Sequence, residues 1–153
     1  KQFMRGPEVA ALSGHIAVAL GKFDQARADF TAALVDAPDD CDVALALGGV
    51  EQQFIAWSAA GERFGRAADC YASSEQELQE SMAKLPPADS RRRASRSRDV
   101  EEAKRQQGRA ALAAAVAWLR NGDREKARRF AERAQLMPNV SSEAGELLKR
   151  LTP

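Results

Sequence analysis

The fold is decided by residues 14–38, which read GHIAVALGKFDQARADFTAALVDAP. Small residues and aromatic residues of this stretch recur 34 residues later. The matching pairs are Gly14/Gly48, Phe23/Trp57, Ala26/Ala60, Phe30/Phe64 and Ala33/Ala67. Each copy holds two apolar helical patterns separated by a short turn, which predicts a helix–turn–helix hairpin. One hairpin cannot bury its apolar face alone, so we expect the hairpins to stack.

The first copy resembles a tetratricopeptide repeat (TPR) of the bacterial type. The resemblance lies at the places where that family has Gly, Ala, an aromatic residue, Ala and Pro, filled here by Gly14, Ala26, Phe30, Ala33 and Pro38. A period of 34 residues is also the tetratricopeptide value. The first helix departs from the family pattern, because the usual large side chains are replaced by Ala10, Ser13 and Ala17.

Two further copies resemble the same family less completely. The second has Ala72 where the family has Pro. The third is recognisable from Asn121 to Ala127 and at Pro138, with Ala115 in place of the Gly. The resemblance therefore implies repeats over residues 7–40, 41–72 and 108–139.

Composition and repeats together predict an all-α fold. The sequence holds 31 Ala, against 10 Val and Ile together and 2 Thr, and Ala is the strongest helix former. The resemblance implies a TPR-like solenoid, a right-handed superhelix that forms a single domain over residues 1–153. A capping helix is expected at 141–151, with Ser141 or Ser142 as its N-cap. The chain begins at Lys1 rather than Met, so we expect it to be part of a longer protein.

Residues 73–107 lie between the second and third copies and allow two interpretations. Pro86-Pro87 must break any helix, so one helix could run to about Lys84 and the next begin near Ser90, its N-cap. The result would be an extended hairpin. Alternatively, Ser74 and Glu77 form a capping box, which would start a degenerate repeat after a break at Ser73. We favour the extended hairpin, because the helix stop signals are stronger at the proline pair.

The resemblance also implies a function, because TPR proteins hold peptides or helices of other proteins in a concave groove. The positions that line it come from the first helix of each repeat. Carried over to this sequence, they are Ala11, His15, Val18 and Ala19, then Leu45, Gly49, Gln52 and Gln53, then Arg109, Leu112, Val116 and Arg120. Ala11, His15 and Gly49 do not supply the clamp of Lys and Asn with which some family members bind a terminal carboxylate. We therefore expect a protein-interaction scaffold that binds an amphipathic or extended segment with some acidic residues.

A basic run suggests a different function, namely binding to nucleic acid or to an anionic surface. Its cationic residues are Arg91, Arg92, Arg93, Arg96 and Arg98. No aromatic residue is interleaved for base stacking, and the net charge of the chain is only +1. We therefore favour a solvated helix start whose arginines face Glu75, Glu77 and Glu80.

The small net charge hides an asymmetry along the chain. Residues 1–90 carry 7 Lys and Arg against 14 Asp and Glu, a balance of −7, whereas residues 91–153 carry 16 against 8, a balance of +8. Such a chain could steer a partner or self-associate head to tail.

The sequence does not predict an enzyme or a cofactor. His15 is the only histidine, and no nucleophile motif or phosphate-binding glycine loop is present. The acidic residues between Asp36 and Asp42 do not match a calcium loop, and no CxxC motif supports structural zinc. A third alternative is therefore a regulatory or accessory domain of a larger enzyme.

Cys41 and Cys70 leave the compartment open. They lie at neighbouring ends of the second hairpin, so a disulfide is conceivable and would argue for an envelope or exported location. We favour two independent thiols and, slightly, the cytoplasm. The longest nearly apolar run, Ala110–Leu119, is too short to span a bilayer.

Overall fold

The computed structural model describes residues 6–152; Lys1, on which the expectation of a longer protein rests, lies outside this range. The described residues form seven helices and no strand, which confirms the all-α class. The helices are α1 (Pro7–Ala19), α2 (Phe23–Asp36), α3 (Cys41–Gln53), α4 (Trp57–Ala83), α5 (Ser90–Arg120), α6 (Arg124–Gln135) and α7 (Ser141–Leu151).

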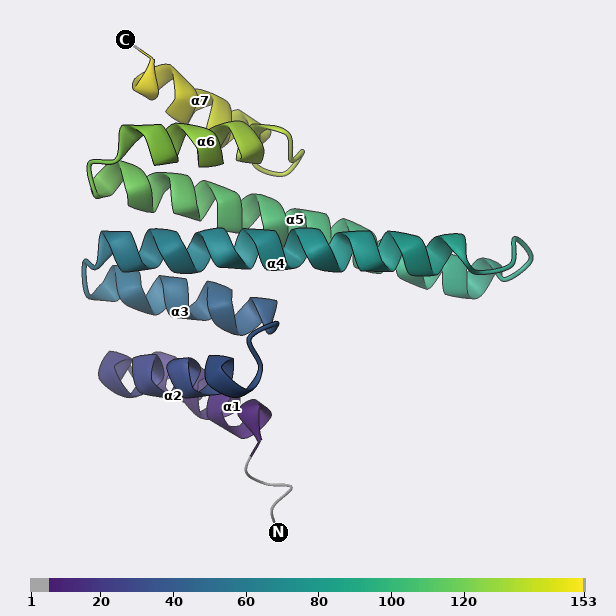
Figure 1. Cartoon of the computed structure of the whole chain (residues 1–153), viewed down its shortest axis with the longest axis horizontal. Coiled ribbons are helices and arrows are strands. Elements are labelled where there is room, and N and C mark those ends of the chain that lie inside the picture. The colour runs from purple at the N-terminus through teal and green to yellow at the C-terminus, as the bar shows by residue number, and fades with distance from the viewer. Residues whose placement is uncertain (1–5, 153) are drawn as a thin grey trace.

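The helices are stacked in chain order from the N-terminus to the C-terminus (Figure 1). Each helix packs mainly against its neighbours in sequence, and the most extensive contact is between α4 and α5. The core runs along the stack as three clusters: one joins α1, α2 and α3, one joins α4 to α7, and one extends from α3 to α7.

In the first helices of two hairpins, a glycine allows an aromatic ring to pack directly against the helix backbone. A Cβ added at Gly14 would lie 2.6 Å from the Phe30 ring, and one at Gly48 would lie 2.5 Å from the Phe64 ring. Both rings are buried. The close approach of helix and ring therefore explains why Gly and the aromatic residue recur together at this spacing.

The hairpin turns share a left-handed backbone position. Gly21 has φ +72° and Gly122 has φ +88°, a conformation that glycine adopts without steric cost. The second hairpin has Ile55 at the same place, with φ 56°. A β-branched residue is strained in this region, and Ile55 is the only non-glycine residue of the range 6–152 that adopts it.

The middle segment forms a long hairpin that extends past the other helices (Figure 1). Helix α4 continues through Ser73 and Ser74, so the described structure has no break there. Pro86 and Pro87 lie in the connection between α4 and α5. These bounds match the extended hairpin and not the degenerate repeat.

Two predicted N-caps are wrong. Asp89 rather than Ser90 caps α5, because its carboxylate accepts a hydrogen bond from the Arg92 backbone N–H at 3.3 Å. Helix α7 begins at Ser141, but its N-cap is Val140, and no side chain accepts a hydrogen bond there. The Ser141 hydroxyl lies at the first helical position and not at the N-cap position before it. From there it does not face the free backbone N–H groups of the first helical turn.

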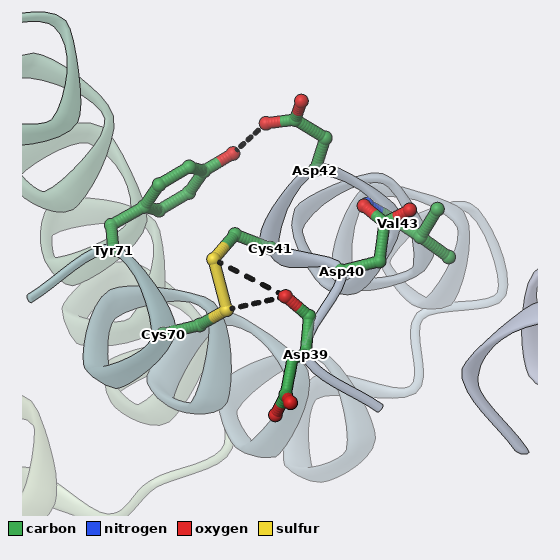
Figure 2. Close-up of a disulfide and its surroundings, with 7 residues drawn as sticks. All are labelled: Asp39, Asp40, Cys41, Asp42, Val43, Cys70 and Tyr71. Atoms are coloured by element: carbon green, nitrogen blue, oxygen red, sulfur yellow. Dashed lines mark hydrogen bonds between the residues drawn. A yellow bond between two sulfur atoms is a disulfide. The ribbon is translucent and has the colours of Figure 1, made fainter. Parts of the chain in front are cut away.

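Cys41 and Cys70 form a disulfide, so the expectation of two free thiols is wrong (Figure 2). After the turn of the second hairpin, α4 runs back along α3 and passes the start of that helix. The Cα atoms of the two cysteines are therefore 5.4 Å apart, which is within the range that a disulfide spans. The Asp39 carbonyl oxygen lies 3.3 Å from Cys70 Sγ. The oxidised sulfur has no proton to donate, so this is a contact rather than a hydrogen bond.

Candidate functional site

A groove of about 620 Å³ lies between α3 and α5, with α4 contributing to its wall. Its lining residues are Leu45, Ala46, Gly49, Gln52, Phe64, Arg109, Leu112, Ala113, Val116 and Val140. Most of these side chains are apolar, and Arg109 brings the only formal charge among them. The groove therefore offers an uncharged surface with one cation beside it.

Six of the residues predicted to line a groove meet in this one place. On α3 they are Leu45, Gly49 and Gln52, and on α5 they are Arg109, Leu112 and Val116. Within each helix they are spaced three and four residues apart, which places them on one face. The two faces come from repeats separated by more than fifty residues of chain, and the stacking of the hairpins brings them together.

The other predicted groove residues do not line this hollow. Ala11, Val18 and Ala19 lie on α1, where Val18 and Ala19 are exposed. His15 also lies on α1, and its ring meets the edge of Phe30 at a centroid distance of 4.9 Å.

Gln53 and Arg120 also lie outside the groove, at the ends of α3 and α5. Gln53 is exposed. The Arg120 guanidinium carbon is 5.0 Å from the centroid of the Trp57 ring, which places it at the turn end of the second hairpin. The structure therefore brings six of the twelve predicted positions together and leaves the other six outside the groove.

Sequence reasoning missed four of the lining residues. Ala46 and Ala113 are next to predicted positions, and Phe64 was recognised only as the repeat counterpart of Phe30. Its ring does pack on Gly48, but it also reaches the groove wall. Val140 precedes α7 and lies outside the repeated pattern, so no periodic signal marked it.

Arg109 is well placed to bind an acidic group. It is exposed, and its guanidinium donates a hydrogen bond to the Gln106 side-chain oxygen at 3.1 Å. No carboxylate belongs to the groove lining. An acidic residue of a ligand would therefore meet a cation that no lining carboxylate neutralises.

The basic run forms the first turns of α5, at the tip of the long hairpin. Arg91, Arg92, Arg96 and Arg98 are exposed, and Arg92 forms an exposed ion pair with Asp89 at 3.6 Å.

Arg93 is different, because its guanidinium donates to the carbonyl oxygens of Met82 and Leu85 at 3.3 and 3.2 Å. Within residues 6–152, no ion pair joins the basic run to Glu75, Glu77 or Glu80. The predicted pairing of the arginines of the basic run with glutamates of α4 is therefore not formed.

A second hollow of about 400 Å³ lies between α4 and α6. At two lining positions glycine leaves room for an aromatic ring: a Cβ at Gly61 would lie within 3 Å of the Trp118 ring, and one at Gly65 within 3 Å of the Phe130 ring. Its lining carries four cationic and two acidic side chains, of which only Arg133 and Asp69 pair with each other, at 2.6 Å. This hollow therefore carries more charge than the groove, whose lining has Arg109 as its one charged residue.

Two of the acidic residues at the start of α3 have structural partners. Asp40 accepts a hydrogen bond from the Val43 backbone N–H at 3.1 Å and so caps α3. Asp42 accepts one from the Tyr71 hydroxyl (Figure 2). Burial raises the pKa of Tyr71 above its ordinary value, and the hydrogen bond to Asp42 adds to that rise.

In residues 6–152, no three His, Cys, Asp or Glu side chains gather in a way that could hold a metal ion. No helix in the same range combines the length and the apolar character needed to cross a membrane. The chain matches no protein-family model and no curated protein. Its function is therefore inferred from the groove, the long hairpin and the disulfide.

Proposed function

We propose that the chain is a non-catalytic protein-interaction scaffold with a TPR-like, right-handed solenoid fold. It holds a peptide or helix of a partner protein in the groove between α3 and α5. The observation that carries this proposal is the convergence of Leu45, Gly49 and Gln52 with Arg109, Leu112 and Val116 in one apolar groove. A single-domain binding role of this kind also suits a regulatory or accessory part of a larger enzyme.

The chemistry of the groove favours one class of ligand. Leu45, Leu112 and Val116 offer apolar contacts, and Phe64 adds an aromatic wall. Arg109 and Gln52 supply polar contacts beside them. The best ligand is therefore a short helix or extended segment with two or three large apolar side chains and at least one Asp or Glu.

A peptide library displayed on phage tests this proposal. Peptides are selected on the wild-type chain and then screened against a Leu45→Arg/Val116→Arg variant, which places two charges in the apolar groove. The control is Val35→Arg/Leu136→Arg, which adds the same charges at exposed positions outside the groove. Apolar, acidic peptides that bind wild type and control but not the groove variant support the proposal. Peptides that bind all three proteins equally reject it.

The tip of the long hairpin supports a second candidate, binding to nucleic acid or another anionic surface. Among the described residues, no ion pair involves Arg91, Arg96 or Arg98, and all three are exposed. Binding through them must weaken steeply with salt, because each phosphate contact releases a counterion. The test is duplex DNA binding by the wild type and by an Arg91→Ala/Arg96→Ala/Arg98→Ala variant. Binding that is lost both at high salt and in this variant would establish the candidate. Binding that does not depend on salt, or that the variant retains in full, would exclude it.

The disulfide gives an indication of the cellular compartment in which the protein functions. Disulfides persist in oxidising compartments and are rare in the reducing cytosol. The Cys41–Cys70 bond therefore favours an envelope or exported location over the cytoplasm. A thiol-labelling experiment on protein from its native cells tests this, because the bonded pair does not react until a reductant is added.

A further inference from the structure

The hollow between α4 and α6, which we call the α4/α6 hollow, has the walls of a small-molecule site. Its aromatic surface comes from Trp118 of α5 and Phe130 of α6, and the backbone at Gly61 and Gly65 forms the side on α4. Its volume of about 400 Å³ is smaller than the 620 Å³ of the groove and lies within the range of pockets that hold small organic molecules. Rings and backbone favour a ligand with a flat apolar body.

The two glycines depart from the repeated sequence at this place. The residues 34 positions before Gly61 and Gly65 are Arg27 and Thr31 of α2, which carry side chains. Glycine within a helix costs about 0.5–1 kcal/mol relative to Ala, and here the space that it leaves is used by the two rings. The aromatic wall is therefore a feature of this pair of hairpins and not of the repeat in general.

The charged residues of the lining favour an anion. Four cations and two carboxylates leave a balance of +2. Apart from the one pair within the lining, its charged side chains are Arg66, Lys126, Arg129 and Glu62. Within residues 6–152, Arg66 forms no ion pair, whereas Lys126 and Arg129 pair at 3.9 and 3.3 Å with carboxylates outside the lining. Three cations are therefore near a ligand, with one carboxylate among them.

Trp118 adds positive potential to the apolar wall. The Lys126 Nζ lies 4.1 Å from the centroid of its ring, and a cation–π contact of this kind holds the ammonium beside the aromatic surface. The indole N–H of Trp118 is buried and has no acceptor in the part of the chain that the structure describes. Its Nε1 lies beside Gly61, because a Cβ added there would be 2.8 Å away. An N–H dipole without an acceptor leaves its positive end uncompensated, which also favours an anion nearby.

We propose that the α4/α6 hollow binds a small organic anion, which carries a carboxylate, sulfonate or phosphate on a flat apolar body. The anionic group lies among Arg66, Lys126 and Arg129, and the apolar body lies against Phe130 and Trp118. The proposal does not depend on the groove, because the two sites share no lining residue.

Two fluorescent dyes with the same ring system test the proposal. Anilinonaphthalene sulfonate carries an anionic group, and phenylnaphthylamine has the rings without it. The protein is the full chain with Trp57→Phe, in which Trp118 is the one remaining tryptophan. Phe is suited to this position, because Phe23 holds the equivalent place in the first repeat. Quenching of Trp118 fluorescence then reports a dye that binds in the hollow.

Three variants in this background locate the bound dye. The hollow variant is Arg66→Gln/Arg129→Gln, which removes two lining cations and keeps long polar side chains. The charge control is Arg96→Gln/Arg98→Gln, which removes two exposed cations outside the hollow. The groove variant is Leu45→Arg/Val116→Arg. Circular dichroism verifies that each variant is helical.

We expect the sulfonate dye to bind at least about 10-fold more tightly than the neutral dye, a difference of about 1.4 kcal/mol, and to quench Trp118. The hollow variant should bind the sulfonate dye at least about 10-fold more weakly and the neutral dye unchanged. The charge control and the groove variant should bind both dyes at least as tightly as their parent protein.

Several results overturn the proposal. Equal affinity for the two dyes shows that the hollow does not select an anion. Sulfonate binding that the hollow variant retains, or that the charge control loses equally, shows that the lining cations do not hold the dye. Binding lost only in the groove variant assigns the dye to the groove. No binding of the sulfonate dye at about 1 mM, where only an affinity below about 4 kcal/mol escapes detection, also rejects the site.

Discussion

Gly48 and Gly49 are adjacent in α3 but have different surroundings. A Cβ at Gly48 would lie 2.5 Å from the buried Phe64 ring, whereas a Cβ at Gly49 would meet no atom within 4 Å. We predict that Gly48→Ala lowers the free energy of unfolding by about 1–2 kcal/mol, because overpacking exceeds the gain in helix propensity. Gly49→Ala should instead raise it by up to about 1 kcal/mol. Urea unfolding measures both, and equal effects would contradict the packing described for Phe64.

Ile55 adopts a backbone conformation that suits glycine. Its φ is 56° and its side chain is 70% exposed, so replacement relieves strain and loses little burial. We predict that Ile55→Gly raises the free energy of unfolding by about 0.5–1 kcal/mol. Relief of the steric strain stabilises the folded state, and the larger conformational entropy of glycine in the unfolded chain offsets part of that gain. The matched control, Gly21→Ala, introduces strain at the same place in the first hairpin and should destabilise the protein. Thermal unfolding measures both changes; a lower Tm for Ile55→Gly would show that the turn is not strained.

Tyr71 should make stability sensitive to alkaline pH. Burial, and then the hydrogen bond to Asp42, raise the pKa of its hydroxyl in the folded protein. A raised pKa favours folding while the unfolded hydroxyl is still protonated, and this contribution is lost as pH rises above about 10, the ordinary value for Tyr. We predict that the free energy of unfolding falls above that pH in the wild type and falls less in Tyr71→Phe.

The alkaline transition can be followed directly. The chain has one tyrosine, so the ultraviolet absorbance of phenolate reports Tyr71 alone. Phenolate that forms near pH 10 in the folded protein, as in a free tyrosine, would contradict the described burial and hydrogen bond.

Some residue-level features could be predicted from the sequence and others could not. The Gly–aromatic pairs recur at a fixed period, so the sequence marked Gly14 and Phe30 as structural positions, but only the structure shows that the ring packs on the glycine. The ion pair of Arg27 with Glu51, at 2.8 Å, was not predicted. It joins side chains of α2 and α3, and no periodic pattern encodes a contact between different repeats.

The elements follow the sequence closely where stop signals are strong. The proline pair separates α4 from α5, and the long hairpin ends there as predicted. Caps were harder to predict, because Asp89 and Ser90 are both good N-cap residues and only the backbone geometry selects Asp89. The state of Cys41 and Cys70 was not predictable either, since it depends on a distance between helices and on a compartment that the sequence does not name.

The disulfide ties α3 to α4 across 29 residues of sequence. Closing a loop of this length in the unfolded chain stabilises the folded state by about 3–4 kcal/mol in the chain-entropy treatment. We predict that Cys41→Ser/Cys70→Ser lowers the free energy of unfolding by about this amount, as measured in urea. The wild type treated with a reductant should lose a similar amount. Unchanged stability in both would contradict the bond.

At the scale of the whole molecule, stacking creates surfaces that single repeats do not have. The groove needs residues of α3 and α5 together, and six of its lining residues hold equivalent positions in the repeated sequence pattern. It could not identify which repeats enclose a hollow, because that depends on the distance between helices. The exposure of Val9, Leu12, Ile16 and Leu20 on α1 was not predicted either, since their pattern matches that of covered residues in α3 and only the position in the stack differs.

The central claim is that the groove between α3 and α5 binds a partner segment. The most direct measurement is calorimetric titration of a selected peptide into wild type, Leu45→Arg/Val116→Arg, and Arg91→Ala/Arg96→Ala/Arg98→Ala. The account predicts that the groove variant binds at least about 50-fold more weakly, a loss of more than about 2 kcal/mol, and that the arginine variant binds as the wild type does. Binding retained by a folded groove variant and lost by the arginine variant would contradict the account and transfer the function to the tip of the long hairpin.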